Sequence, residues 1–255
     1  MTKTIHKPDL QAHDIWAAFS LLTRLPVPVD HARAGARGAA AAWAFPVVGL
    51  IVGGAAGAMA AFAEWLGLPA GMAAASALAF LAVVTGGMHE DGLADFADAM
   101  GGMTVERRLE IMKDSRIGAY GVIALSIALL ARWSGIGEMS GLTVVFTLAA
   151  VGAASRAVMV WLMFAMPPAR KTGLSAGIGK PNVTTVLVAS GIAFLACVIL
   201  TGLSGVVLFV LIFAGALPVY WLANRTLGGQ TGDVLGAAQQ VTEIVGLAAA
   251  IALLA

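Results

Sequence analysis

The sequence predicts an all-α protein, a bundle of about seven membrane-spanning helices (six to eight) with a further N-terminal helix at the membrane interface. Of its 255 residues, 60% are hydrophobic and only 11% are charged, against roughly a quarter charged in soluble domains. The mean hydropathy of +0.91 leaves too little polar surface to coat a soluble globule. Lipid must therefore contact much of the surface, and seven segments are long enough to cross a bilayer.

The chain begins with a segment, residues 1–41, that we expect on the cytoplasmic side and at the membrane interface. Within it, DIWAAFSLLTRL at 14–25 is too short to span and ends at Pro26. Proline cannot continue a helix, so an amphipathic helix lying in the interface plane is predicted here.

The predicted transmembrane bundle, residues 42–255, contains the seven spans. The fifth and sixth are separated only by Gly202–Gly205, which predicts a tight hairpin, and the seventh is interrupted by Gln239, Gln240 and Glu243. No polar stretch is long enough to bury a core of its own, so we expect one integral-membrane domain over 1–255. Glycines inside the first span, such as Gly49 and Gly53, would let helices approach closely. The spans are 42–62, 69–88, 119–137, 141–166, 183–203, 204–223 and 233–254.

Positive charge predicts the orientation of the bundle. With seven crossings, thirteen of the fifteen Lys and Arg residues fall in loops on one side, which is therefore expected to be cytoplasmic. Arg132 falls toward the other side, and Arg156 lies within the fourth span. The net charge of +1 and the interleaved acids give no reason to expect nucleic acid as a partner.

An acidic segment, GGMHEDGLADFAD at 86–98, predicts a metal site. Asp91, Asp95 and Asp98 are spaced +4 and +3, so a helix would place all three carboxylates on one face. A bound cation would relieve their mutual repulsion, and hard oxygen ligands suit Mg²⁺ or Mn²⁺. His89 could anchor the interface, donate or accept hydrogen bonds in the site, or bind the metal; hard-metal chemistry makes the last the least expected.

Three further segments carry candidate phosphate contacts, all expected on the same side. RRLEIMKDSRIGAYG at 107–121 offers Lys113 and Arg116, a further carboxylate at Asp114, and glycines that can expose backbone N–H groups. GLSAGIGK at 173–180 ends in Lys180, although this is not the P-loop pattern. RTLGGQTGD at 225–233 begins with Arg225 and ends with Asp233, which opens a polar stripe along the seventh span.

Arg156 lies about ten residues from the cytoplasmic end of its span, or roughly 15 Å deep at 1.5 Å per residue. A charge at that depth needs a partner. We expect Arg156 to point at the acids or at a bound phosphate.

At these residues the sequence resembles a known family. TRLPVP (23–28), GGMHEDGLADFAD (86–98), EIMKDSRIGAYG (110–121) and RTLGGQTGDVLGAA (225–238) are similar to cobalamin synthase, the adenosylcobinamide-GDP ribazoletransferase family of bacteria and archaea. The similarity runs from about Ile15 to Glu243, with one departure at Ala99, where the family pattern has Gly.

The resemblance implies an Mg²⁺-dependent transferase of the bacterial inner membrane. A ribose hydroxyl of α-ribazole, or of α-ribazole 5′-phosphate, would attack the cobinamide-linked phosphorus of adenosylcobinamide-GDP, and GMP would leave. On this view Asp91 and Asp95 are the main Mg²⁺ ligands, and Asp98 is a ligand or general base. His89 is a second catalytic candidate, Asp114 and Asp233 are further ligands, and the phosphate contacts are Lys113, Arg116, Arg156, Lys180 and Arg225.

Two other classes stay open at this point. A lipid enzyme of the CDP-alcohol phosphotransferase kind would share the metal chemistry, but its motif has a longer gap to the second acid pair. A secondary transporter would use Arg156, Asp233 and Glu243 as an ion pathway, yet most charges here cluster at one surface and no inverted repeat is visible. Assembly into a homo-oligomer also stays open.

Overall fold

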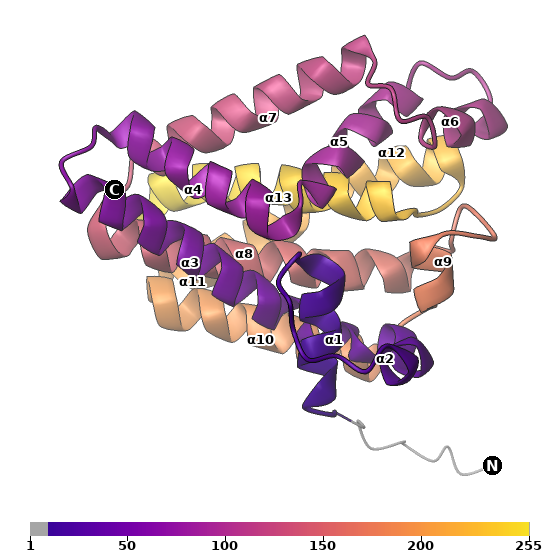
Figure 1. Ribbon diagram of the computed structural model, residues 1–255, viewed down its shortest axis with the longest axis horizontal. Coiled ribbons are helices and arrows are strands. Elements are labelled where there is room, and N and C mark those ends of the chain that lie inside the picture. Colours follow the sequence, from indigo (N-terminus) through magenta and orange to yellow (C-terminus); the bar gives the residue numbers. More distant parts are fainter. Residues whose placement is uncertain (1–9, 255) are drawn as a thin grey trace.

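The computed structural model describes residues 10–254, and over that range its regular elements are all helical (Figure 1). This confirms the predicted all-α fold. Residues 1–9 of the predicted N-terminal segment lie outside the described residues. The elements are α1 (His13–Leu22), α2 (His31–Arg37), the 3-10 helix η1 (Gly38–Ala44), α3 (Phe45–Trp65), α4 (Ala70–Thr85), α5 (Met88–Ala99), α6 (Val105–Ile111), α7 (Ala119–Gly137), α8 (Gly141–Ala165), α9 (Leu174–Ile178), α10 (Val183–Thr201), α11 (Ser204–Gly215), α12 (Leu217–Leu227) and α13 (Gly232–Leu254).

The number of spans agrees with the prediction. Within the described residues six helical stretches are long and apolar enough to cross a membrane, and the number is seven if the bent pair formed by α4 and α5 is counted as one span. Five of the six begin and end within four residues of the segments predicted for them; the first extends back through α2 and η1 to His31. The chain is therefore a multi-pass membrane protein by its helix composition.

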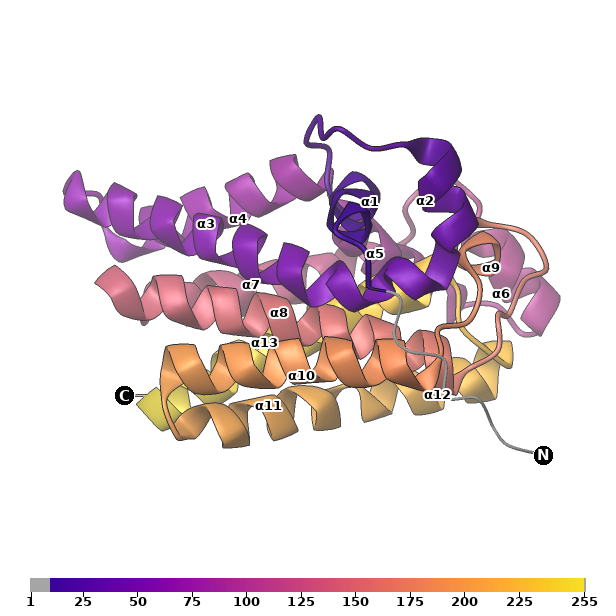
Figure 2. The same cartoon turned by 90° about the horizontal axis from the view of Figure 1, so that it is seen from below.

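The long helices lie side by side along the long axis of the molecule, with α8 at their centre (Figures 1 and 2). Helix α8 is buried almost continuously from Thr147 to Met163. It packs most extensively against α3, where a Cβ added to Gly49 or Gly152 would overlap the carbonyl of the other. The predicted close approach of helices at small residues is thereby confirmed.

Helices α4 and α5 differ from the predicted continuous second span. Helix α4 ends at Thr85, α5 begins at Met88, and the two are bent by 88°. Gly86 and Gly87 between them have φ angles of +68° and +66°, which glycine adopts without a steric cost. Helix α4 has only 16 residues, or about 24 Å at 1.5 Å per residue. The acidic helix α5 therefore leaves α4 at a sharp corner (Figure 1).

The short helix predicted before the first span is confirmed as α1. It runs across the bundle rather than along it (Figure 2), as an interfacial helix would. Fully buried Asp14 ties α1 to the next elements, because it accepts hydrogen bonds from Arg37 Nη2 at 2.6 Å and from Trp43 Nε1 at 2.7 Å. Burial favours a raised pKa for Asp14, but these hydrogen bonds outweigh it and hold the pKa below its usual value.

The segments predicted to share one side of the membrane share one end of the bundle. Helices α6 and α9 and the junction between α12 and α13 lie together there, whereas the turn between α10 and α11 lies at the opposite end (Figures 1 and 2). Which end faces the cytoplasm stays a prediction.

Candidate functional site

Helix α5 is placed by a close crossing with α13. A Cβ added to Gly92 would lie 3.0 Å from Cα of Asp233, and one added to Gly236 would lie 3.2 Å from Cα of His89. Only glycine permits this separation of the two backbones. The crossing brings Asp233, at the start of α13, beside the acidic face of α5, where its charge interacts with that of Asp91.

A cavity of about 650 Å³, called here the polar cavity, opens against that face. Asp91 and Asp95 line it from α5, Lys113 lines it from the segment after α6, and Arg24 lines it from the segment after α1. None of these four side chains forms an ion pair with another described residue. The polar cavity therefore holds two carboxylates and two cations whose charges are available to a ligand.

Asp114 and Arg116 also line the polar cavity, but they are bonded to each other. Arg116 Nη2 lies 2.7 Å from Asp114 Oδ2, and both side chains are exposed. The side-chain hydrogen bonds from Arg116 lower the pKa of Asp114 to about 2. Asp114 is therefore ionised at physiological pH and already has a cationic partner.

Asp98 is turned toward the first turn of α7. Its Oδ2 accepts the backbone N–H of Gly118 at 2.7 Å, and its Oδ1 accepts that of Gly121 at 2.8 Å. A Cβ on Gly118 would come within 2.5 Å of the carboxylate, and one on Gly121 would come closer still. The N–H groups that the sequence suggested for a phosphate are thus bonded to Asp98, and glycine is needed there for the carboxylate to fit.

The predicted metal ligands do not converge on one point. Within residues 10–254 no group of three or more His, Cys, Asp or Glu side chains is arranged to hold a metal ion. The contacts explain why: Asp98 is bonded to α7, Asp114 to Arg116, and Asp233 to Arg170 at 3.2 Å. Asp91 and Asp95 are the two predicted ligands left with unpaired carboxylates.

His89 lines a second cavity of about 190 Å³, called here the apolar cavity. Its side chain is 1% exposed, and neither ring nitrogen has a hydrogen-bond partner. Met88 and Asp91 line both cavities, so the two adjoin at the start of α5. The apolar walls come from Leu21, Leu22, Phe45, Met159, Met163, Ala176 and Leu235, and the polar ones include Ser175, Gln230, Thr231, Asp233 and Arg170.

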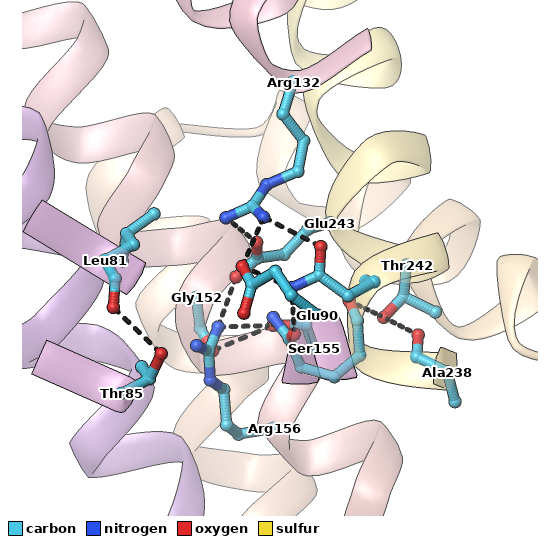
Figure 3. Close-up of polar contacts among 12 residues, drawn as sticks. Leu81, Thr85, Glu90, Arg132, Gly152, Ser155, Arg156, Ala238, Thr242 and Glu243 are labelled. Atoms are coloured by element: carbon cyan, nitrogen blue, oxygen red, sulfur yellow. Dashed lines mark hydrogen bonds and ion pairs between the residues drawn. The ribbon is translucent and has the colours of Figure 1, made fainter. Parts of the chain in front are cut away.

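Arg156 is buried at 3% exposure and forms a short ion pair with Glu243 of α13. Its Nη1 also contacts Ser155 Oγ at 3.1 Å (Figure 3). Of the partners considered from the sequence, the structure thus provides a carboxylate of the seventh span. A contact between Arg156 and substrate stays a prediction.

Arg132 of α7 completes a buried ionic network with Glu90, Arg156 and Glu243 (Figure 3). Arg132 Nη1 lies 2.8 Å from Glu90 Oε1, and Nη2 lies 2.9 Å from Glu243 Oε2. Gln240 bonds both Arg132 and Glu90, at 2.8 and 3.0 Å. Arg132 is 2% exposed, so the sequence-based placement of this charge on the far surface is wrong. Two cations and two carboxylates balance, as burial within a membrane requires.

Lys180 and Arg225 line neither cavity. Lys180 Nζ lies 5.0 Å from the centre of the Phe164 ring, and the Arg225 guanidinium lies 5.0 Å from the ring of Trp221. Both side chains are exposed. The structure therefore does not bring these two predicted phosphate contacts to the acidic helix.

Sequence reasoning missed Arg24, Arg170 and the partners of Arg132 as members of the site. Arg24 stands within TRLPVP, so its presence in that motif was a usable signal. Arg132 lies inside the third span, and the depth argument applied to Arg156 would have identified it as well. No comparable signal marks Arg170, whose approach to Asp233 depends on how two loops fold together.

Comparison with known proteins gives one consistent result. The sequence profile of the cobalamin-5-phosphate synthase family matches residues 14–251. The adenosylcobinamide-GDP ribazoletransferase of Mesorhizobium japonicum is 43% identical over 94% of this chain and 93% of its own length. That of Bradyrhizobium diazoefficiens is 43% identical over 91% and 90%, and that of Citrobacter koseri is 38% identical over 92% and 97%. No solved structure matches the chain significantly.

Proposed function

Because the chain belongs to the cobalamin-5-phosphate synthase family, we propose that it is an adenosylcobinamide-GDP ribazoletransferase, the activity for which its relatives are named. Such an enzyme transfers the adenosylcobinamide phosphate group to α-ribazole or α-ribazole 5′-phosphate and releases GMP. This step completes the nucleotide loop of coenzyme B12.

The charged residues that line the polar cavity are the main structural support for this proposal. A substrate diphosphate brings negative charge that Lys113 and Arg24 can hold, since neither has an ion-pair partner among the described residues. In the transfer, the acceptor hydroxyl oxygen forms a bond to the cobinamide-linked phosphorus, and the bond from that phosphorus to the GMP oxygen breaks. GMP leaves with the electron pair, and the hydroxyl proton passes to a base of the protein.

Two bases of the protein are candidates for that proton. Asp95 lines the polar cavity, and His89 lies in the adjoining apolar cavity with both ring nitrogens unbonded. Asp98, with both oxygens bonded to α7, is better suited to position that helix than to take up a proton.

Asp91 and Asp95 would hold Mg²⁺ in this enzyme. Mg²⁺ is commonly bound by one or two carboxylates together with substrate phosphates, and among the described residues these two carboxylates line the polar cavity without a hydrogen-bond or ion-pair partner, unlike the other predicted ligands. When bound, the metal neutralises charge on the phosphate oxygens. Asp114 has both oxygens bonded to Arg116, so it could join as a ligand only by releasing that residue, whereas Asp233 bonds Arg170 through Oδ2.

We also propose that the end of the bundle with α6 and α9 faces the cytoplasm of a bacterial cell and that the bundle, one integral-membrane domain, lies in the inner membrane. Within the described residues, α6, α9 and the junction between α12 and α13, which carry or adjoin many of the bases predicted for the cytoplasmic side, lie at that end (Figure 1). Nucleotide substrates would then reach the polar cavity from the cytoplasm.

The test is GMP release from adenosylcobinamide-GDP by purified protein, with and without α-ribazole. Asp91→Asn and Asp95→Asn should each lower the rate on the order of 10²–10³-fold or more, because a neutral amide removes a charge partner of the metal at constant size. Glu138→Gln, which removes an exposed acid just after α7, should keep the wild-type rate. Near-wild-type turnover of both Asp variants at saturating Mg²⁺ would exclude these carboxylates from the site.

A further inference from the structure

We propose that the apolar cavity is the acceptor subsite, which binds the heteroaromatic base and ribose of the nucleoside with His89 as its hydrogen-bonding group. This inference rests on the proposed function. Transfer joins two substrates at one phosphorus, so the enzyme needs two subsites that meet. The two cavities adjoin at Met88 and Asp91, beside the carboxylates of α5.

The residues that line each cavity indicate which of the two substrates it binds. Arg24 and Lys113 in the polar cavity suit a diphosphate. The apolar cavity is walled mainly by hydrocarbon side chains such as those of Phe45, Met159 and Met163, with polar groups among them. Among the described residues its one cation, Arg170, is paired with Asp233, so no free positive charge is left there for a phosphate. Small neutral ligands are typically held by such a lining, in which the polar groups fix their orientation. An uncharged aromatic base attached to a ribose matches it, whereas a nucleoside diphosphate does not.

His89 provides an independent sign that a ligand belongs in the apolar cavity. The ring is 1% exposed, yet neither Nδ1 nor Nε2 has a hydrogen-bond partner among residues 10–254, although buried polar groups almost always have one. Arg132 and Arg156, whose charges act on His89, are each paired with Glu243. A neutral imidazole can donate one hydrogen bond and accept another, which a ribose hydroxyl can satisfy.

One wall of the apolar cavity is formed by the segment after α8 and the start of α13, which are bonded together. Gln230 donates its backbone N–H to Pro167 O at 2.9 Å and accepts that of Ala169 at 2.8 Å. The side chain of Gln230 accepts a short hydrogen bond from Ser175 of α9. The segments 167–176 and 230–236 thus form a preorganised wall with both polar and apolar groups.

Two substitutions change the size of the apolar cavity at residues that are not candidates for catalysis. Met163→Ala enlarges it and Ala176→Phe partly fills it. Each should raise KM for α-ribazole about tenfold or more, because hydrophobic pockets discriminate by this much per methylene-sized change. KM for adenosylcobinamide-GDP should stay within about twofold, well below that factor. Met166→Ala is the matched control, since Met166 is equally buried at 1% but does not line the cavity.

Binding without turnover provides the second readout. α-Ribazole should bind the detergent-solubilised wild-type protein in the absence of donor, and His89→Leu should weaken that binding without lowering the apo-protein's unfolding temperature. Loss of stability in His89→Leu would instead assign His89 a purely structural role and overturn its part in the proposal.

The possible outcomes distinguish a failure of the subsite proposal from a failure of the ribazoletransferase assignment on which it rests. Wild-type protein that releases no GMP with α-ribazole would contradict the ribazoletransferase activity itself. An active wild type would overturn the subsite assignment if Met163→Ala and Ala176→Phe leave KM and binding of α-ribazole unchanged. Equal effects in Met166→Ala, or a shift in KM for adenosylcobinamide-GDP alone, would overturn it as well.

Discussion

Asp98 accepts the backbone N–H groups of Gly118 and Gly121 and so closes the open first turn of α7. The first N–H groups of a helix lack partners within the helix, and a carboxylate there also interacts favourably with the helix dipole. Asp98 thus connects the acidic helix α5 to α7 across 20 and 23 residues of sequence.

Asp98→Asn should lower stability by about 1–3 kcal/mol, because one oxygen becomes an NH₂ group that cannot accept a backbone N–H. Gly121→Ala should also destabilise, since its Cβ would overlap the intact Asp98 carboxylate. Thermal unfolding in detergent measures both. Unchanged unfolding temperatures in the two variants would show that this contact does not support the fold.

The spacing of Asp91, Asp95 and Asp98 was enough to predict a shared helix face, because side-chain direction along a helix follows from sequence distance. It was not enough to separate the three roles. Asp98 meets α7, whereas Asp91 and Asp95 meet a cavity. That difference depends on where a helix 20 residues later begins, which local periodicity does not encode.

At the scale of elements, the corner between α4 and α5 places the acidic helix within the bundle. Gly87→Ala should cost about 1–2 kcal/mol, because an L-residue is strained in the left-handed region, and it should reduce transfer by displacing α5. No atom lies within 4 Å of the added Cβ, so the effect is purely conformational.

Gly191→Ala is the matched control for that variant. Gly191 also has open space around its Cβ position, lacks a positive φ and lies inside α10. Alanine there should leave stability unchanged or raise it by up to about 1 kcal/mol. Activity and unfolding temperature are measured on both proteins. Equal activities and unfolding temperatures of Gly87→Ala and Gly191→Ala would show that the bend between α4 and α5 does not depend on a glycine at position 87.

The buried ionic network connects α5, α7, α8 and α13. Arg132→Met should destabilise by about 3–5 kcal/mol, because it leaves Glu90 without a cation and Glu243 with one fewer. Arg156→Met should cost less, since Glu243 keeps Arg132. Adding Glu90→Gln to Arg132→Met should recover part of the loss in a double-mutant cycle. A cycle with no coupling energy would contradict the pairing.

Helix positions were predictable because an apolar stretch of about twenty residues has few alternatives in a bilayer. The break at Gly86–Gly87 was not, since two glycines also fit inside a continuous apolar helix near its end. The partners of Arg132 and Arg156 were equally hidden, because they depend on which helices become neighbours.

For the whole molecule, orientation can be measured with single cysteines. The native Cys197 is fully buried, so it should give little background labelling. Lys171→Cys, in the loop after α8, and Glu138→Cys, just after α7, should react with a membrane-impermeant reagent from opposite sides. Lys171→Cys should be labelled from the cytoplasmic side. Labelling of both from the same side would contradict the seven-span topology.

Charge alone predicts the side of each loop, since basic residues are retained in the cytoplasm during insertion, and the structure brings the segments predicted for one side to one end of the bundle. Which bases reach the polar cavity was only partly predictable: Lys113 and Arg116 line it as expected. Arg24 lines the polar cavity, whereas Lys180 and Arg225 rest on aromatic rings away from it. That choice follows from the closure of the bundle around α5, which no single segment determines.

The buried ionic network also has a consequence for how the chain is made. Synthesis runs from the N-terminus, so α7 and α8 enter the membrane with Arg132 and Arg156 before α13 exists. Glu243, which bonds both arginines, is carried by this final helix. Until it arrives, Glu90 is the one carboxylate of the network available to the two arginines. The buried charges therefore balance only when the last helix packs, which makes insertion of α13 the step that removes the cost of an unpaired charge in the membrane.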